Sequence, residues 1–227
     1  MPDAAETARD CYMTQTRQVR LANESGRVPV VFIQGPWLKP SGWDRWAALF
    51  ARTGYAPVNP GWAQDTERHY SSVIGALARR PAVVGHSFGG LLAQTIAGRG
   101  QSAATVAIAP VAPFLTYEQF RRTFASAVPE DEARNLYATF AVSASGGKVT
   151  EYAAGATSPD RGPMLIICGH SDAIVPCAVS YANYERQRRN PGVTEFSEMP
   201  RRGHSMIIDD GWPEVAAAAL AFIRRHT

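Results

Sequence analysis

Residues 82–94 read AVVGHSFGGLLAQ, and this stretch decides the fold. An apolar run at 82–85 is typical of a buried strand, and it passes through GHSFG (85–89) into a helical pattern at 88–100. A glycine two positions before and two positions after a serine is the pattern of a sharp strand-to-helix turn, where side chains would collide. Such a turn exposes the Ser87 hydroxyl at the end of the sheet, beside the positive end of a helix. The stretch therefore predicts a nucleophilic serine on an α/β scaffold.

The rest of the chain alternates between short apolar runs and longer amphipathic stretches. We expect strands at 28–33, 55–60, 82–85, 104–110 and 164–169, a weaker strand at 194–199, and helices at 41–53, 66–80, 88–100, 179–189 and 212–225. This alternation indicates an α/β fold with a doubly wound, mostly parallel sheet. With 227 residues, 45% of them hydrophobic, the chain is expected to form a single domain with a sizeable core.

Two segments interrupt the alternation. Residues 1–27 receive no firm assignment, because RQVRL (17–21) fits an extra strand while the first dozen residues fit a loose, partly disordered segment. Residues 111–161 hold two helix-like pieces and a stretch rich in Gly, Ala and Ser, inserted between two strands. We expect this insertion to form a small helical lid over the strand ends.

Composition and charge limit the classes of partner that we expect for the chain. The net charge of +3 comes from scattered arginines, and the one cluster, at 186–189, is expected to be the solvated face of a helix, so no nucleic-acid partner is predicted. No 18-residue apolar run and no signal pattern occurs, which favours a cytoplasmic protein without a membrane partner. The cysteines, Cys11, Cys168 and Cys177, are odd in number, which argues against a disulfide framework and for a reducing compartment.

The sequence also lacks the motifs of the common cofactors. It contains no phosphate-cradling loop, no dinucleotide fingerprint and no cluster with metal-ligand spacing. We therefore expect neither a cofactor nor a metal, and a small molecule as the substrate.

A serine hydroxyl is a weak nucleophile unless a base takes its proton, so the chain must supply a histidine. His204 follows the weak strand directly and precedes the last helix, which is where a base belongs. His86 lies inside the turn and is expected to pack in the core. His69 and His226, in a helix and at a helix end, are expected to be structural or exposed.

The imidazole in turn needs an acid that fixes its tautomer and stabilises its charged form. Asp172 comes three residues after an apolar strand and is the predicted acid. The alternatives, Asp160, Asp209 and Asp210, are expected to be caps or surface charges. His170 fits either a hydrogen bond near the site or a position on the loop surface.

The order Ser87, Asp172, His204 is the chain order expected for this type of turn. Over residues 28–225 the chain resembles the α/β-hydrolase superfamily, and within it a group of small bacterial hydrolases. The segments that carry the resemblance are QGPWLKPSGWDRW, VVGHSFGGLLAQ, GHSDAIVP, TEFSEMPRRGHS and DDGWPEVAAAALAFI. The resemblance implies the fold and the triad but leaves the reaction open. The superfamily includes esterases, lipases, thioesterases and lactonases, and also haloperoxidases, hydroxynitrile lyases and C–C hydrolases.

The resemblance also identifies an unusual oxyanion hole. In the superfamily the strand that matches VVFI (30–33) usually ends in His-Gly-X, and the N–H of X and the N–H after the nucleophile, here of Phe88, bind the oxyanion. The matching residues are Gln34, Gly35 and Pro36, and proline has no N–H. Loss of one donor costs about 10²–10³ in rate. Either a shifted loop lets the Trp37 N–H donate, or Phe88 acts with a side-chain donor, Gln34 being the nearest, or the reaction needs no complete oxyanion hole.

Aromatic residues of the turn and the lid are candidates for the substrate pocket. Pro36, Phe114, Tyr117 and Phe120 would line an apolar cleft, although at helical spacing the lid aromatics fit the core of the lid equally well.

The sequence thus predicts a cofactor-free serine hydrolase that cleaves an ester, lactone or thioester of a small apolar substrate. Ser87 attacks, His204 acts as general base and then acid, and Asp172 orients it. The alternative is a non-hydrolytic lyase or cyclase, a tailoring step on a small natural product, that uses these residues for acid–base chemistry. A binding protein without catalysis is disfavoured, because all three triad positions are filled.

Overall fold

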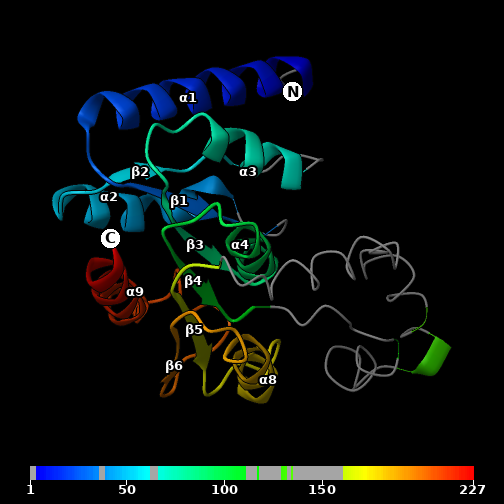
Figure 1. Ribbon diagram of the computed structural model, residues 1–227. Coiled ribbons are helices and arrows are strands. Elements are labelled where there is room, and N and C mark those ends of the chain that lie inside the picture. The colour runs from blue at the N-terminus through cyan, green and yellow to red at the C-terminus, as the bar shows by residue number, and fades with distance from the viewer. Residues whose placement is uncertain are drawn as a thin grey trace.

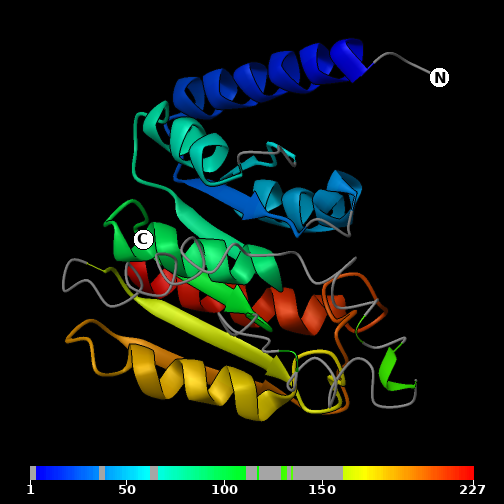
Figure 2. The ribbon, with the colours of Figure 1, turned by 90° about the vertical axis from the view of Figure 1, so that its right-hand side faces the viewer.

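The computed structural model describes residues 4–35, 39–61, 66–110, 117, 129–131, 134 and 161–227. In this part of the chain one six-stranded sheet has the order β2-β1-β3-β4-β5-β6, and every pair of neighbours is parallel. The strands are β1 (Pro29–Ile33), β2 (Ala56–Val58), β3 (Ala82–His86), β4 (Ala104–Ile108), β5 (Met164–Gly169) and β6 (Thr194–Met199). The predicted fold class is confirmed. Figure 2 shows the strands side-on, with their arrowheads pointing the same way.

Helices cover both faces of the sheet (Figure 1). They are α1 (Ala4–Ser25), the short 3-10 helix η1 (Pro40–Trp43), α2 (Asp44–Arg52), α3 (Thr66–Gly75), α4 (Phe88–Gly98), α8 (Cys177–Gln187) and α9 (Trp212–His226). Successive residues of β1 point to opposite faces. Val30 and Phe32 enter a core with α2 and α9, whereas Val31 and Ile33 enter a core with α1, α3 and α4. Burial on both faces explains why the inner strands are largely apolar, whereas β6, at one edge of the sheet, is mostly half-buried and mixed in composition.

Four aromatic side chains fill the centre of the α2–α9 core. The ring of Phe32 lies 5.2 Å from that of Trp43 and 5.5 Å from that of Phe50, and Trp43 lies 5.2 Å from Trp46. Aromatic pairs at such distances contribute about 0.5–1.5 kcal/mol each beyond their buried area. Trp46 also donates a hydrogen bond from Nε1 to the Ile207 carbonyl oxygen at 2.9 Å. This bond ties α2 to the loop that follows β6.

Residues 17–21, which received no firm assignment and fit an extra strand by sequence, belong to α1. Val19 and Ala22, three positions apart, are both buried against the core that includes β2, as one face of a helix requires. Asn23 donates from Nδ2 to the Ala76 carbonyl at 3.0 Å, which links the end of α1 to the chain after α3. Figure 1 shows α1 beside β2, where the sheet ends.

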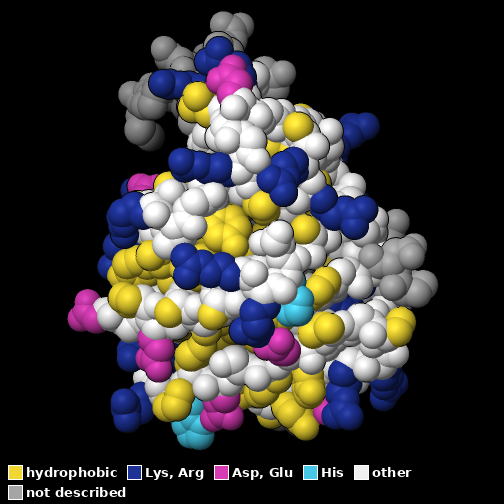
Figure 3. Space-filling view, turned by 60° about the vertical axis from the view of Figure 1, so that its left-hand side comes forward, with side chains coloured by type: hydrophobic (Ala, Val, Ile, Leu, Met, Phe, Trp, Pro, Cys, Tyr) yellow, Lys and Arg dark blue, Asp and Glu magenta, His cyan; other side chains and the backbone are white. Residues whose placement is uncertain are grey.

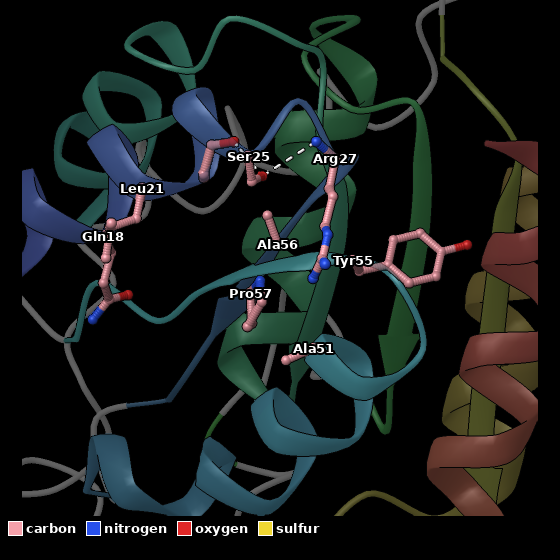
Figure 4. A pocket seen from close by; sticks show the side chains of 9 residues that line it. Gln18, Leu21, Ser25, Arg27, Ala51, Tyr55, Ala56 and Pro57 are labelled. Carbon is pink, nitrogen blue, oxygen red and sulfur yellow. Dashed lines mark hydrogen bonds between the residues drawn. The ribbon is translucent and has the colours of Figure 1, made fainter.

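A surface groove of about 270 Å³ lies between α1 and β2 (Figure 4). It is lined by Gln18, Leu21, Ala22, Ser25, Arg27, Ala51, Tyr55, Ala56 and Pro57. Ala56 is the first residue of β2, whereas Ser87 follows the last residue of β3. Because the strands are parallel, these two residues lie at opposite ends of the strands. The groove is therefore separate from the candidate site.

Charged side chains are spread over the face of the molecule shown in Figure 3. On the face shown in Figure 3, basic side chains alternate with acidic and apolar ones. Of the clustered arginines, Arg188 and Arg189 are exposed as predicted. Arg186 differs: it is half-buried, donates to Asn183 Oδ1 at 3.1 Å, and has a pKa lowered by burial. No helix in the described ranges combines the length and the apolar character needed to cross a membrane.

His86, the last residue of β3, is buried in the core as predicted, with 4% of its surface exposed. Its ring lies 4.6 Å from the ring of His204. Burial, together with the neighbouring His204, lowers the pKa of His86 to about 3, against the opposing effects of the Asp172 charge and a hydrogen bond with the His204 backbone. His86 is therefore neutral in the folded protein at pH 7.

This burial predicts a pH-dependent stability. The unfolded chain binds a proton at His86 near pH 6.5, whereas the folded protein binds it only near pH 3. The free energy of unfolding should therefore fall as the pH drops from 6.5 towards 3, with a contribution that approaches about 1.4 kcal/mol per pH unit. Urea unfolding of wild type and His86→Gln between pH 7 and pH 4 measures it, and the variant should have the shallower slope.

The difference between the two slopes is the quantity that tests the burial of His86. Parallel curves for wild type and His86→Gln would contradict the buried, neutral state of His86.

Candidate active site

The turn between β3 and α4 holds Ser87 in a backbone conformation that L-residues rarely adopt, with φ 57° and ψ −122°. The Ser87 N–H donates to the Ile108 carbonyl at 2.9 Å, and the Ser87 carbonyl accepts the N–H of Gly90 at 2.9 Å. Hydrogen bonds to β4 on one side and within α4 on the other thus hold the serine at the carboxyl end of β3.

Two glycines make this turn sterically possible. A Cβ atom on Gly85 would lie 2.1 Å from the carbonyl oxygen of Gly89, and a Cβ on Gly89 would lie 2.2 Å from the carbonyl oxygen of Ile33. Both distances are far below any real Cβ contact. The glycines therefore have the role that the sequence pattern predicts: they let α4 begin directly against β1 and β3.

His204 lies between Ser87 and Asp172. Its Nε2 is 3.1 Å from Ser87 Oγ, and its Nδ1 is 2.8 Å from Asp172 Oδ2. The Asp172 side chain is completely buried, while 18% of the His204 side chain is exposed. These distances fit one tautomer, in which Nδ1–H donates to the carboxylate and Nε2 accepts the serine O–H. The structure therefore brings the three predicted residues into one hydrogen-bonded chain.

The loop after β5 fixes the carboxylate of Asp172. Asp172 Oδ1 accepts the N–H of Ile174 at 2.9 Å and the N–H of Val175 at 2.8 Å. These two bonds occupy one carboxylate oxygen and leave Oδ2 directed at His204. The residues after the aspartate thus set the orientation of its side chain.

Backbone contacts join this loop to the loop that carries His204. Ser171 N–H donates to the Arg202 carbonyl at 2.9 Å, and a Cβ on Gly169 would lie only 2.4 Å from the same oxygen. The missing side chain at the end of β5 therefore lets the two loops meet. Further along, Met206 and Ile207 are fully buried and anchor the His204 loop in the core.

The other predicted histidine and aspartate positions lie outside this hydrogen-bonded chain. His170 is exposed and hydrogen-bonded through Nδ1 to Glu198 Oε1. His69 is half-buried in α3, and burial lowers its pKa against hydrogen bonds with the backbone of residues 60–61. Asp209 accepts the N–H of Gly211 at 2.9 Å and so acts as a turn cap. Asp210 is exposed, and Asp160 lies outside the described residues.

The end of β1 lies beside the Ser87 turn. A Cβ on Gly35 would lie 4.0 Å from the backbone nitrogen of Phe88, the first residue of α4. The N–H groups in the first turn of a helix have no intrahelical acceptor and carry partial positive charge. The predicted donor Phe88 is therefore on the side of Ser87 that faces β1.

Gln34 is buried next to this position. Only 2% of its surface is exposed, its N–H donates to the Tyr70 hydroxyl at 3.3 Å, and the Tyr70 O–H donates to the Gly61 carbonyl at 3.0 Å. Its Oε1 has no hydrogen-bond partner within the described ranges. Pro36 and Trp37 lie outside those ranges, so the second oxyanion donor stays a prediction.

The predicted lid and pocket fall mostly outside the described residues. Phe114 and Phe120 are among the residues not described. Tyr117 is helical, its O–H donates to the Glu130 carbonyl at 3.2 Å, and the Arg134 guanidinium lies 4.6 Å from its ring centre. These contacts lie within the insertion, and the pocket role of all these residues stays a prediction.

The expectation that the cysteines form no disulfide is wrong for two of them. Cys168 is the second-to-last residue of β5, and Cys177 is the first residue of α8. A disulfide joins them, with a Cα–Cα distance of 5.2 Å. The odd number of cysteines concealed this pair, because a count does not show which residues the fold brings together. A sequence signal does exist, since the two cysteines bracket Asp172.

Comparisons with known proteins agree with this architecture. No curated protein matches the sequence. Among solved structures, the monoacylglycerol lipase of Paleococcus ferrophilus has a TM-score of 0.64 at 17% identity, covering 88% of this chain and 95% of that one. A metagenome-derived lipolytic enzyme of the pair LipS and LipT has a TM-score of 0.63 at 20% identity, covering 88% of this chain and 94% of that one. The thioesterase domain from the curacin biosynthetic pathway has a TM-score of 0.61 at 14% identity, covering 86% of this chain and 92% of that one.

At such low identity these structures show a shared fold. A sequence profile goes further, because residues 30–218 match the family described as "Alpha/beta hydrolase family". The match includes all three members of the hydrogen-bonded chain and most of the protein. The chain therefore belongs to the alpha/beta hydrolase family.

Proposed function

We propose that the protein is a cofactor-free serine hydrolase that cleaves an ester, lactone or thioester of a small apolar substrate. The observation that carries the proposal is the hydrogen-bonded chain from Ser87 Oγ through His204 to Asp172. Membership in the alpha/beta hydrolase family supports a hydrolytic reaction. The lipase and thioesterase names among the structures of the same fold support an acyl substrate.

We assign a role to each residue of this hydrogen-bonded chain. Ser87 Oγ attacks the acyl carbon while His204 Nε2 takes its proton. Asp172 holds the Nδ1–H and stabilises the imidazolium that forms. His204 then returns the proton to the leaving group, and a water molecule repeats the sequence to release the acid and free Ser87. His86, neutral because it is buried, adds no second positive charge beside His204.

The oxyanion of each tetrahedral intermediate needs donors on the β1 side of Ser87. We assign one donor to the Phe88 N–H, which lies near Gly35 at the start of α4. We assign the second to the Trp37 N–H, with the side chain of Gln34 as the nearest alternative. No contact in the described ranges favours the lyase or cyclase reaction.

The nucleophile is tested by covalent labelling. A fluorophosphonate probe should label wild type at Ser87, and Ser87→Ala should lose both the label and at least about 10³-fold of the hydrolysis of p-nitrophenyl butyrate, because no other group supplies the nucleophile. Ser205→Ala, next to His204 but hydrogen-bonded to Asp209, should keep both. Labelling that survives Ser87→Ala would overturn the assignment.

The acid is tested by its isosteric amide. Asp172→Asn should lower kcat by about 10⁴, because an amide cannot stabilise the imidazolium and favours the wrong tautomer. KM should change little. Asp210→Asn, an exposed aspartate six residues after His204, is the matched control and should stay within about threefold of wild type. Equal kcat values for both variants would contradict the role of Asp172.

The oxyanion hole is tested by restoring an N–H. If Trp37 already supplies the second donor, Pro36→Ala should leave kcat within about threefold of wild type. Pro40→Ala, in η1, controls for the general effect of removing a proline from this segment. A rise in kcat of about 10²–10³ in Pro36→Ala alone would mean that the native site lacks a donor, contrary to the assignment.

A further inference from the structure

The disulfide Cys168–Cys177 closes the loop that carries Asp172. Cys168 is completely buried near the end of β5, and Cys177 is half-buried at the start of α8. Nine positions separate them, and Asp172 lies near the middle. Their Cα–Cα distance of 5.2 Å is within the range that a disulfide spans without backbone movement.

The two halves of this loop are held differently. In the first half, His170 N–H donates to the Met199 carbonyl at 3.0 Å and Ser171 N–H donates to the Arg202 carbonyl at 2.9 Å. In the second half, residues 173–177, the backbone hydrogen bonds within the described ranges are local, because Ile174 and Val175 bond to Asp172 itself, and the Val175 side chain packs in the core. The disulfide is therefore the covalent tie between β5 and the half of the loop that orients the carboxylate.

We propose that Cys168 and Cys177 form a reversible thiol–disulfide site that controls the position of Asp172 and thereby the rate of the reaction. The proposal rests on the proposed function only through the role of Asp172. The oxidised protein holds Asp172 Oδ2 at 2.8 Å from His204 and is the active form. In the reduced form the second half of the loop loses its tie, and the aspartate no longer holds the imidazole in one orientation.

The chemistry needs a dithiol as reductant. One of its thiolates attacks a sulfur of the pair, the S–S bond breaks, and a mixed disulfide forms. The second thiolate of the reagent then displaces the protein sulfur, so that the protein gains two S–H groups and the reagent leaves as a cyclic disulfide. Cys177 is the more accessible of the two cysteines, so the reagent attacks there first.

Glu198 lies against the disulfide. Its carboxylate oxygen and the two sulfurs all lie within 4.8 Å of one another. The same carboxylate is hydrogen-bonded to His170 on the loop. Because a dithiol reagent closes into a cyclic disulfide and a monothiol does not, we expect the disulfide to open with dithiothreitol and to resist a monothiol of equal concentration.

The experiment compares both redox states of one protein. Cys11→Ser, which removes the third cysteine, provides the background. Iodoacetamide alkylation and intact mass should find no free thiol before dithiothreitol and two after it. In parallel, kcat should fall about ten- to a hundredfold, as for a small misplacement of a catalytic group, while KM stays within about twofold. Reoxidation with oxidised glutathione should restore kcat.

Two variants separate positioning from general loosening of the fold. Cys168→Ser combined with Cys177→Ser should have the kcat of the reduced protein and no response to dithiothreitol. Asp172→Asn should keep its residual rate of fluorophosphonate labelling unchanged on reduction, because the disulfide then has no carboxylate to position. A response in Asp172→Asn equal to that of the parent would overturn the proposal.

Other results would also overturn it. Two free thiols before reduction, or an unchanged kcat after complete reduction, would exclude the switch. Full activity of the reduced protein with one bound zinc ion would make the pair a metal site instead. Absence of labelling and turnover in both redox states would refute the proposed function, and the thiol count would still report whether the disulfide exists.

Discussion

The close approach of α4 to β1 and β3 is the constraint on which the site depends. Gly89 lies so near the Ile33 carbonyl, and Gly85 so near Gly89, that neither position has room for a Cβ atom. This contact forces Ser87 into its strained conformation and places its hydroxyl at the strand ends. The other groups of the site act on that hydroxyl: His204 Nε2 lies 3.1 Å from it, and Asp172 acts on it through His204.

Sequence patterns predicted the elements that depend on local chemistry. The strand–turn–helix around Ser87 and the positions of Asp172 and His204 just after strands are local signals, and they sufficed to name the residues that the fold brings together. The helix over Val19 and the bond between Cys168 and Cys177 were missed. A short stretch with alternating charged residues fits a helix and a strand equally well. A disulfide depends on which cysteines the fold brings close together, and the count of cysteines does not show this.

The two neighbouring histidines of the site differ in whether they can carry a positive charge. His86 and His204 have ring centres 4.6 Å apart, yet only His204 contacts the carboxylate of Asp172. Burial and the neighbouring His204 lower the pKa of His86 to about 3, so one positive charge at most forms next to the acid. A second charge there would compete for the same carboxylate. The sequence motif thus contains a histidine whose chemical contribution is to stay neutral.

The position of α1 has a consequence for the whole molecule. The sheet ends at β2, and a terminal strand offers unpaired N–H and C=O groups to any extended chain nearby. Val19 and Ala22 pack α1 beside this strand, and the Gln18 side chain accepts the N–H of Asn59 just after it. The helix thereby covers part of an edge strand that an extended chain could otherwise pair with.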